Sequence, residues 1–380
     1  MDFDLTEDHL RLREMVRDFA RSEIAPNAAA WDRDGTFPAG AVRRMGELGL
    51  MGVQIPEAYG GAGLDPISGA IVVEEIARAD ASSSVILSVN NSLVCNLILK
   101  HGSEEQKRRI LPDLASGRKL GCYGLSEPGA GSDSANQKTR AVRDGSDYVL
   151  TGTKNFITTG SEADVAIVIA TTDPALGKKG ISAFVVPTDT PGFRPGKPEK
   201  KMGLHASPTT EIHLENCRVP APDRIGEEGA GLKIALSTLD EGRIGIGAQA
   251  VGIAQASLDA AISYSKERTQ FGSPIASFQS VQWMLADMAT EIEAARLLVY
   301  RAAHAKTRGG RYTREAAMAK LFASETCRRA TEKAVQIHGG YGYTRDYPVE
   351  RYFRDGRITE IYEGTSQMQR LVIARGLLGE

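Results

Sequence analysis

The periodicity of apolar side chains changes twice along this chain, and the order of the resulting blocks limits the folds that it can adopt. Residues 5 to about 120, and again residues 231 to the end, carry apolar side chains at helical spacing. Between them lie short runs rich in β-branched and aromatic residues, bounded by Gly, Pro, Asp and Asn, which is typical of a small antiparallel barrel or sandwich. The long, alanine-rich segments after Gly231 predict an antiparallel helix bundle.

The sequence therefore predicts a mainly α-helical protein with a β insert. We expect three domains: an N-terminal α-helical domain over residues 1–120, an antiparallel β-barrel domain over 121–228 and a helix-bundle domain over 229–380. The first helix is expected to begin after Thr6, which can cap it, and to end at Pro26. Gly339 and Gly340 are expected to cap the last of the long helices at its C-terminus.

Composition excludes several classes of protein. A chain of 380 residues with 42% hydrophobic and 25% charged residues is ordinary for a globular protein with a large core. The formal net charge of −2 gives no general case for binding nucleic acid. The four cysteines form no Cys-x-x-Cys pair and the six histidines lack ligand spacing, so we predict neither a metal site nor a disulfide framework.

The N-terminal stretch "MDFDLTEDHLRLREMVRDFARSEIAP" is acidic and amphipathic, unlike a secretory signal or an Arg-rich transit peptide. No run in the chain approaches the roughly 18 consecutive apolar residues that a membrane span requires. We therefore expect a cytoplasmic protein without a membrane span.

The first candidate site is a segment dense in small residues and hydroxyl groups, "YGLSEPGAGSDSA" at 123–135. A glycine-rich backbone of this kind can approach a flat heterocycle or a pyrophosphate closely. The spacing is not that of a Rossmann fingerprint, and no Gly-Lys-Ser/Thr of a Walker loop follows. In "KNFITTG" (154–160), Phe156 and Thr158 face the same way if the run is a strand. A plain turn-rich loop and simple strand patterning are the alternatives for the two segments.

Two later segments also carry candidate chemistry. In "SKERTQFGSPIASFQSVQ" (265–282), Arg268, Phe271 and Gln279 surround a Gly-Ser-Pro turn. An arginine beside an aromatic ring suits phosphate pairing and ring stacking, and a surface arginine is the alternative. In "EIYEGTSQMQR" (360–370), Glu363 precedes a helix that Thr365 or Ser366 can cap. It is either a solvated loop glutamate or a catalytic base.

Taken together and in this order, these segments resemble the acyl-CoA dehydrogenase family over essentially the whole chain. "YGLSEPGAGSD" is similar to the family's flavin signature, and four later segments match its other motifs: "DEGRIGIGAQAVGIAQ", "ERTQFGSPIASFQSVQ", "QIHGGYGYTRDYPVERYFRD" and "IYEGTSQMQR". The resemblance implies the acyl-CoA dehydrogenase fold, with a C-terminal four-helix bundle. It also implies an FAD-dependent oxidation of a short- or medium-chain acyl-CoA to trans-2-enoyl-CoA, as in the short-chain, butyryl-type enzymes of fatty acid β-oxidation.

The resemblance further implies which residues hold FAD. Those expected near the flavin ring are Tyr123, Leu125, Ser126, Gly131, Ser132, Phe156 and Thr158. Those expected to reach the FAD of a neighbouring subunit are Arg268, Phe271 and Gln279, and the rest of the cradle is Gln336, Gly339, Gly340, Thr365 and Gln367. A cofactor shared in this way implies a homo-oligomer, and the family implies a homotetramer that passes electrons to electron-transfer flavoprotein.

For the substrate, the resemblance implies that Glu363 removes the α proton of the thioester and that four residues contact the acyl-CoA: Ser132, Asp240, Arg243 and Gly364. One subclass of the family carries its base on the bundle helix, where this chain has Gly242. Glu241 is adjacent to that position and is the second candidate for the base. A glutamate at 363 places the chain with the short-, medium- and 2-methyl-branched-chain enzymes.

Several alternatives stay open at this point. The same fold supports acyl-CoA oxidases and flavin monooxygenases, which use oxygen directly, and a 2-methyl-branched-chain acyl-CoA dehydrogenase would carry the same base. From other classes, a flavin-holding binding protein or a purely structural helical bundle is conceivable. A purely structural helical bundle would not explain why the β insert is rich in glycine and hydroxyl-bearing residues.

Overall fold

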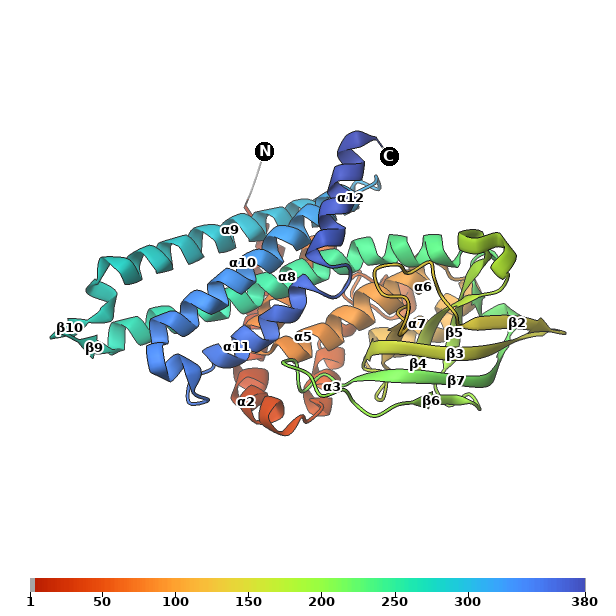
Figure 1. The fold of residues 1–380 in the computed structure, drawn as a ribbon, viewed down its shortest axis with the longest axis horizontal. Coiled ribbons are helices and arrows are strands. Elements are labelled where there is room, and N and C mark those ends of the chain that lie inside the picture. Colours follow the sequence, from red (N-terminus) through yellow and green to blue (C-terminus); the bar gives the residue numbers. More distant parts are fainter. Residues whose placement is uncertain (1–3, 380) are drawn as a thin grey trace.

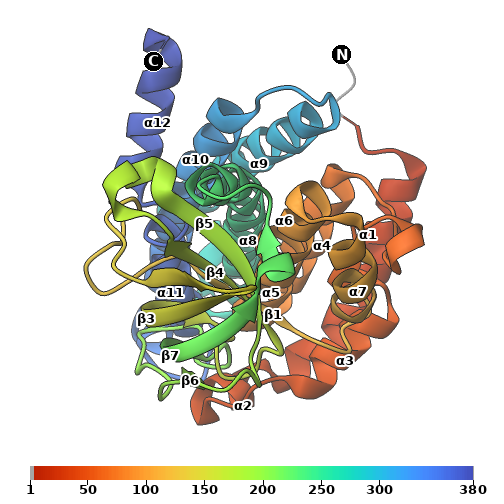
Figure 2. The same ribbon diagram turned by 90° about the vertical axis from the view of Figure 1, so that its right-hand side faces the viewer.

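The computed structural model of the protein describes residues 4–379. The outer limits that we expected for the first and last domains, residues 1 and 380, lie outside this part. Helices from the two ends of the chain pack together, and a β sheet lies against one end of them (Figures 1 and 2). This helix–sheet–helix order along the chain is the one that the sequence predicted.

The N-terminal part is mainly helical. Thr6 caps the first helix as predicted, because its hydroxyl accepts a hydrogen bond from the backbone N–H of His9. The expected helix end at Pro26 is wrong: the chain continues through a π-helical turn, and Pro26 lies in the first turn of the next helix, where a missing N–H costs no hydrogen bond. The helices are α1 (Glu7–Phe19), α2 (Ala25–Asp34), α3 (Ala39–Glu47), α4 (Pro66–Ala79), α5 (Ala81–Ser88), α6 (Asn96–His101) and α7 (Glu104–Ala115).

A π-helical turn, η4 (Val89–Cys95), joins α5 to α6 into one continuous helical stretch, Ala81–His101. By length and composition this stretch could cross a membrane, but 94% of its most apolar window is buried inside the protein. Such burial is what a core helix requires. It packs with α4 against a long helix of the C-terminal part, α8 (Gly231–Glu267).

The β part is an eight-stranded sheet with the strand order β6-β7-β3-β2-β4-β5-β8, and β1 pairs with β4. The expected closed, antiparallel barrel is wrong in two respects. Within the described residues the end strands β6 and β8 do not pair, and β1 and β2 run parallel to β4. Both end strands are short, which leaves the sheet open. The strands are β1 (Gly121–Gly124), β2 (Arg140–Asp144), β3 (Asp147–Thr158), β4 (Val165–Thr171), β5 (Ile181–Pro187), β6 (Phe193–Pro195), β7 (Thr209–Pro220) and β8 (Arg224–Ile225).

Three long helices form the C-terminal bundle: α8 (Gly231–Glu267), α9 (Gln279–Thr307) and α10 (Thr313–His338). Two shorter helices, α11 (Val349–Gly356) and α12 (Ser366–Leu378), pack onto α10. Gly339 caps the end of α10, as the sequence predicted, with φ of 59° and ψ of −133°, a conformation that glycine adopts readily. A small hairpin, β9 (Thr269–Gln270) and β10 (Ser273–Pro274), joins α8 to α9 at the end of the molecule farthest from the large sheet (Figure 1).

Candidate active site

Glu363 lies in the short connection before α12, against the first half of α8. Thr365 caps α12 by accepting a hydrogen bond from Met368 N–H, which confirms one of the two predicted caps. Glu363 has φ of 51°, in the left-handed region that a non-glycine residue rarely adopts, and Gly364 follows with φ of 90°. This turn directs the Glu363 carboxylate at Gly242 of α8, where a β-carbon would overlap Oε2.

The surroundings of Glu363 disfavour its charged form. Glu363 as a residue is partly exposed, but its Oε2 atom is shielded from solvent and has no hydrogen-bond partner among the described residues. Burial raises the pKa of Glu363 to about 7, and the positive charges of Lys320 and Arg243 oppose that rise. A carboxylate with a pKa close to neutral pH is suited to general-base catalysis.

The glycine-rich segment after β1 is brought close to Glu363. Tyr123 in β1 is buried, and burial together with the negative charge of Glu363 raises the pKa of its phenol. Lys154 of β3 is hydrogen-bonded to this segment: its Nζ donates to Leu125 O at 3.2 Å and to Glu127 Oε1 at 2.7 Å. Asn155 N–H donates to Ser126 O at 2.9 Å. These bonds fix Leu125 and Ser126 beside the end of β3.

The end of β3 departs from the regular alternation that the sequence suggested. Phe156 has φ of 58°, the pairing register with β7 shifts between Lys154 and Ile157, and the Phe156 ring is 66% exposed. Ile157 is buried, whereas Thr158, the last residue of the strand, is partly exposed. Phe156 and Thr158 therefore both lie off the buried face of the sheet, although a bulge rather than a flat strand places them there.

Gly131 and Ser132 lie exposed in the loop between β1 and β2. A β-carbon at Gly131 would meet open space, so the backbone there is accessible to a ligand. At the start of α12, Thr365 is partly exposed and Gln367 is exposed. Of the residues expected near the flavin ring, Tyr123 is close enough to Glu363 for the two groups to interact electrostatically, and the place of the others in the cofactor site stays a prediction.

Three of the remaining residues expected to hold FAD, Arg268, Gly339 and Gly340, line a hollow of about 470 Å³ at the hairpin end of the bundle. Arg268 lies there with its guanidinium carbon 5.7 Å from the Tyr341 ring centre, and Gly339 and Gly340 form the backbone wall. Phe271 at the hairpin tip is 96% exposed, and Gln279 and Gln336 are exposed nearby on α9 and α10.

A single chain does not bring these two groups together. The hairpin that carries Arg268 and Phe271 lies at the opposite end of the molecule from the sheet that carries Tyr123 and Phe156 (Figure 1). This separation agrees with the expectation that Arg268, Phe271 and Gln279 serve the FAD of a neighbouring subunit, which stays a prediction.

The residues present fit FAD. Near Glu363, buried polar atoms of three side chains have no hydrogen-bond partner among the described residues: Tyr123 OH, Ser366 Oγ and Gln369 Oε1. In the hollow at the hairpin end, β-carbons at Gly339 and Gly340 would meet open space. The unpartnered polar atoms near Glu363 could bind a polar ring system. The open backbone and the arginine at the hairpin end could bind phosphates. FAD contains both kinds of group.

The acidic and basic residues of "DEGR" form a compact arrangement on α8. Arg243 Nη1 donates to Asp240 Oδ1 at 2.6 Å, and Thr313 Oγ1 donates to Asp240 Oδ2 at 2.6 Å. Arg243 is buried, and its Nε has no partner in the described part of the chain. Its positive charge faces Glu363 as well as Asp240.

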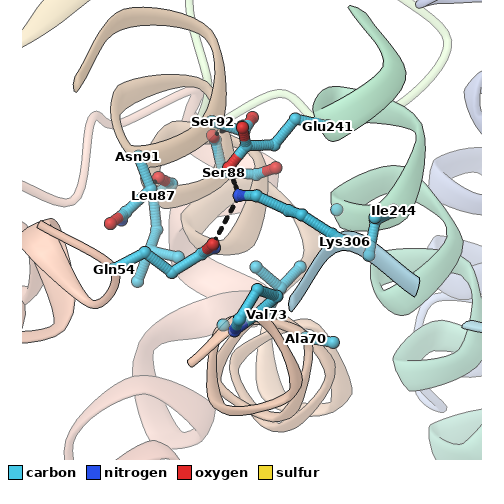
Figure 3. Close-up of a pocket in the computed structure, with 13 residues that line it drawn as sticks. Gln54, Ala70, Val73, Leu87, Ser88, Asn91, Ser92, Glu241, Ile244 and Lys306 are labelled. Atoms are coloured by element: carbon cyan, nitrogen blue, oxygen red, sulfur yellow. Dashed lines mark hydrogen bonds and ion pairs between the residues drawn. The ribbon is translucent and has the colours of Figure 1, made fainter. Parts of the chain in front are cut away.

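Glu241, the second candidate for the base, is bound to other partners. Its carboxylate accepts a hydrogen bond from Asn96 Nδ2. It also pairs with Lys306, whose Nζ donates to Gln54 Oε1 at 2.6 Å as well (Figure 3). This cluster borders a small cavity of about 30 Å³ between α4, α5 and α8. Because Gly242 and not Glu241 lies against Glu363, the structure gives Glu241 a role in an ion pair.

Four residues around Glu363 were not predicted from the sequence: Lys320, Gln369, Tyr362 and Gln249. Lys320 Nζ donates to Gly364 O at 2.6 Å, Gln369 Nε2 donates to the same oxygen at 2.8 Å, and Tyr362 OH donates to Gln249 Oε1. A signal for Lys320 was present: it shares the apolar face of its helix with Ala316, Ala319, Ala323 and Cys327 at helical spacing. Gln369 and Gln249 carried no comparable signal.

Across residues 4–379, no group of three or more His, Cys, Asp or Glu side chains is arranged so that it could hold a metal ion.

Comparison with known families agrees with the sequence motifs. The chain matches the family Acyl-CoA dehydrogenase in all its parts: the N-terminal domain over residues 6–118, the middle domain over 122–217 and the C-terminal domain over 229–378. The short-chain specific acyl-CoA dehydrogenase of mouse mitochondria is 52% identical over 375 residues, which cover 99% of this chain and 91% of that protein.

Two solved structures are similar over the full length of both chains. One is butyryl-CoA dehydrogenase from Megasphaera elsdenii, with 46% identity and a TM-score of 0.98. The other is a chain in a structure described as the electron transferring flavoprotein of Acidaminococcus fermentans, with 50% identity and a TM-score of 0.99. On the combined strength of the three matched domains and these full-length similarities, the chain belongs to the acyl-CoA dehydrogenase family.

Proposed function

We propose that this protein removes one hydrogen from each of the α and β carbons of a short-chain acyl-CoA, giving a trans-2-enoyl-CoA, with Glu363 as the base. Acyl-CoA dehydrogenation with FAD is the activity of the family to which the chain belongs. The preference for short acyl chains is supported by the mouse and Megasphaera relatives, which are a short-chain specific and a butyryl-CoA dehydrogenase.

The observation that carries the assignment of Glu363 is the placement of its carboxylate. Oε2 is shielded from solvent and lacks a partner among the described residues. It lies against Gly242, whose lack of a side chain leaves space for the carboxylate. The pKa of about 7 means that a substantial fraction of Glu363 is ionised at neutral pH while the carboxylate remains basic. A salt-bridged surface glutamate would be ionised but too weak a base.

The proton leaves the α carbon as the C–H bond breaks, and it is accepted by the Glu363 carboxylate. FAD held by the residues described above would supply the acceptor for the hydride of the β carbon, so that the substrate loses two hydrogens and two electrons. Negative charge develops on the thioester oxygen during proton removal, and backbone N–H groups directed at that oxygen would stabilise it. Gly364 at φ of 90° keeps the turn after Glu363 free of a side chain there.

Arg243 and Asp240 are proposed to contact the acyl-CoA, and Ser132 to lie between the substrate and the cofactor. The unpartnered Nε of Arg243 supports this role, because a buried guanidinium nitrogen without an acceptor has a hydrogen bond left to make. Ser132 lies in the open loop after β1, where it is accessible from outside.

A homotetramer and electron transfer to electron-transfer flavoprotein are proposed as well. The hollow around Arg268 supports oligomerisation, since it lies far from the residues expected at the flavin ring of the same chain (Figure 1). The similarity to the chain from the Acidaminococcus fermentans structure supports the electron acceptor. A cytoplasmic location stays a prediction of the sequence.

The proposal is tested by mixing the purified, FAD-loaded protein with acyl-CoA thioesters in the absence of oxygen and recording loss of the flavin absorbance. We expect butyryl-CoA to reduce the flavin faster than octanoyl- or 2-methylbutyryl-CoA. Glu363→Gln should slow the reduction by a factor of about 10²–10⁴, while Glu241→Gln serves as the matched control and should reduce at close to the normal rate. Normal reduction by Glu363→Gln would contradict the assignment, and rapid reoxidation in air would favour an oxidase.

A further inference from the structure

We propose that Lys320 is a positioning residue for the base, acting on Glu363 from α10 in two ways. Its ammonium group holds the peptide that follows Glu363, and its positive charge keeps the carboxylate available in its ionised form. This inference rests on the proposed function, in which Glu363 takes the α proton. Neither effect requires Lys320 to touch the substrate or FAD.

The first observation is the contact itself. Lys320 is completely buried on α10, and its Nζ donates to the carbonyl oxygen of Gly364 at 2.6 Å, 44 positions along the chain. Lysine is among the residues that are almost never fully buried unless they are paired. A neutral donor would satisfy the Gly364 carbonyl equally well, so the charge of Lys320 needs an explanation of its own.

The second observation is that the backbone held by Lys320 is in an unfavourable conformation. Glu363 lies in the left-handed region, which is unfavourable for a residue with a side chain and persists only when the surroundings enforce it. Gln369 Nε2 donates to Glu363 O at 3.2 Å and to Gly364 O at 2.8 Å. Lys320 and Gln369 thus hold the backbone carbonyl groups of Glu363 and Gly364 in place, and we call this arrangement the clamp. By fixing this backbone, the clamp fixes the direction of the Glu363 side chain.

The third observation is the balance of charges around Glu363. On α10 the positive group is Lys320. On α8 it is Arg243, which is already paired with Asp240 at 2.6 Å. From β1 and from its own segment Glu363 faces only neutral phenols, Tyr123 and Tyr362, and η4 contributes the apolar Leu93. Lys320 also interacts electrostatically with Glu360 and Arg243. Within the described residues, however, no carboxylate is hydrogen-bonded to Lys320, whereas Arg243 has Asp240 as its partner.

Burial and charge act on these two groups in opposite directions. Burial lowers the pKa of Lys320 to about 8, and the negative charge of Glu363 counteracts that effect. Lys320 in turn limits the rise in the pKa of Glu363 that burial causes. Without the positive charge, the carboxylate would be protonated over a wider range of pH and would accept the substrate proton less often at neutral pH.

The test compares four variants as FAD-loaded protein. Lys320→Met removes both the hydrogen bond and the charge, Lys320→Gln keeps a donor without the charge, and Lys320→Arg keeps the charge. Gln369→Met loosens the clamp and leaves the charge. Lys333→Gln is the matched control, since Lys333 is on the same helix but pairs with Asp287 on α9.

The readout is the pH dependence of α-deuterium exchange in D₂O into an acyl-CoA whose β carbon is replaced by sulfur. Such a thioester has α protons but no β hydrogen, so exchange reports on the base separately from flavin reduction. We expect Lys320→Met and Lys320→Gln to raise the apparent pKa of the base by about one unit or more, as the loss of a close opposite charge does. Lys320→Arg, Gln369→Met and Lys333→Gln should leave it near the normal value.

Above the apparent pKa, where the base is fully ionised, the exchange rate reports on the clamp. We expect Gln369→Met and Lys320→Met to be slower there by about tenfold or more, and Lys320→Gln to be closer to normal. An unchanged apparent pKa in folded Lys320→Met or Lys320→Gln overturns the electrostatic role. If Lys320→Met does not fold, Lys320→Gln alone decides that point.

The outcome is separable from failure of the proposed function. If Glu363→Gln still exchanges the α proton at the normal rate, Glu363 is not the base and the proposed function fails first. If Glu363→Gln is inactive and the Lys320 variants behave as the normal protein does, only the role of Lys320 is lost.

Discussion

Gly242 on α8 lies directly opposite the carboxylate of Glu363, so closely that a β-carbon at residue 242 would overlap Oε2. The two residues are far apart in sequence and meet only in the folded chain. The same β-carbon would also lie within 2.9 Å of Leu93 of η4. Gly242 therefore creates the space in which the Glu363 carboxylate can stand.

Replacing Gly242 by alanine should displace the Glu363 carboxylate without harming α8 itself. Alanine favours a helix interior over glycine by about 1 kcal/mol, so the fold should be retained. We expect anaerobic flavin reduction to slow by about tenfold to hundredfold because a small misplacement of a catalytic group is costly. The control is Gly245→Ala, one turn along the same helix, where the β-carbon would meet Ser88 Oγ. Equal rates for the two variants would contradict this account.

Flavin reduction should depend on pH through Glu363. The base must be ionised, and its pKa is raised to about 7, so the rate should be low at acid pH, reach half its maximum near pH 7 and level off above that. The measurement is single-turnover bleaching by butyryl-CoA between pH 5 and 9. A half-maximum near the ordinary value for glutamate, about 4.3, would mean that burial does not act on the base in this way.

The same shift has a consequence for stability. The pKa of Glu363 is higher in the folded chain than in the unfolded chain, so its contribution to stability is full below the unfolded value and is lost as pH rises through about 7. Glu363→Gln cannot ionise and avoids that loss. We expect its melting temperature to exceed that of the normal protein at pH 8, with a smaller difference at pH 5, by thermal unfolding of the FAD-loaded proteins. A constant difference across this range would contradict the shift.

Arg268→Ala should weaken FAD binding. Arg268 borders the hollow at the hairpin end of the bundle together with Gly339 and Gly340, and the loss of an arginine–phosphate pair costs about 1.5–3 kcal/mol, or roughly 10- to 100-fold in affinity. The measurement is the FAD retained after gel filtration, together with the oligomeric state. Arg143→Ala, on the exposed strand β2, is the control. Full retention of FAD by Arg268→Ala would remove this residue from the cofactor site.

Lys154→Met should destabilise the loop that follows β1. Lys154 and Glu127 are both buried and are joined at 2.7 Å, so removal of the lysine leaves a buried carboxylate without its ion-pair partner, at a cost of about 3–5 kcal/mol. The double variant Lys154→Met, Glu127→Gln should recover part of this loss. Thermal unfolding is the measurement, and Lys138→Met, exposed in the same loop, is the control. A double variant no better than Lys154→Met would argue against the ion pair.

Local signals in the sequence accounted for the order of helical and β blocks, and three caps were confirmed: Thr6, Gly339 and Thr365. The family was also evident from the motifs and is confirmed by the comparisons. These features are determined by neighbours within a few residues or by the motif itself. Pro26 shows the limit of such local signals. It was expected to end the first helix, but a π-helical turn precedes it and Pro26 lies in the first turn of α2.

The closure of the sheet and the chemistry of Glu363 were decided by tertiary structure. Whether β6 and β8 pair is a relationship between strands that are separated in the sequence, so no single segment specifies it. Glu363 meets Gly242, Lys320 and Tyr123 from three distant parts of the chain. The sequence by itself determined which residue carries the carboxylate. Burial and charge act through distance in space, so only the folded chain determined its pKa and direction.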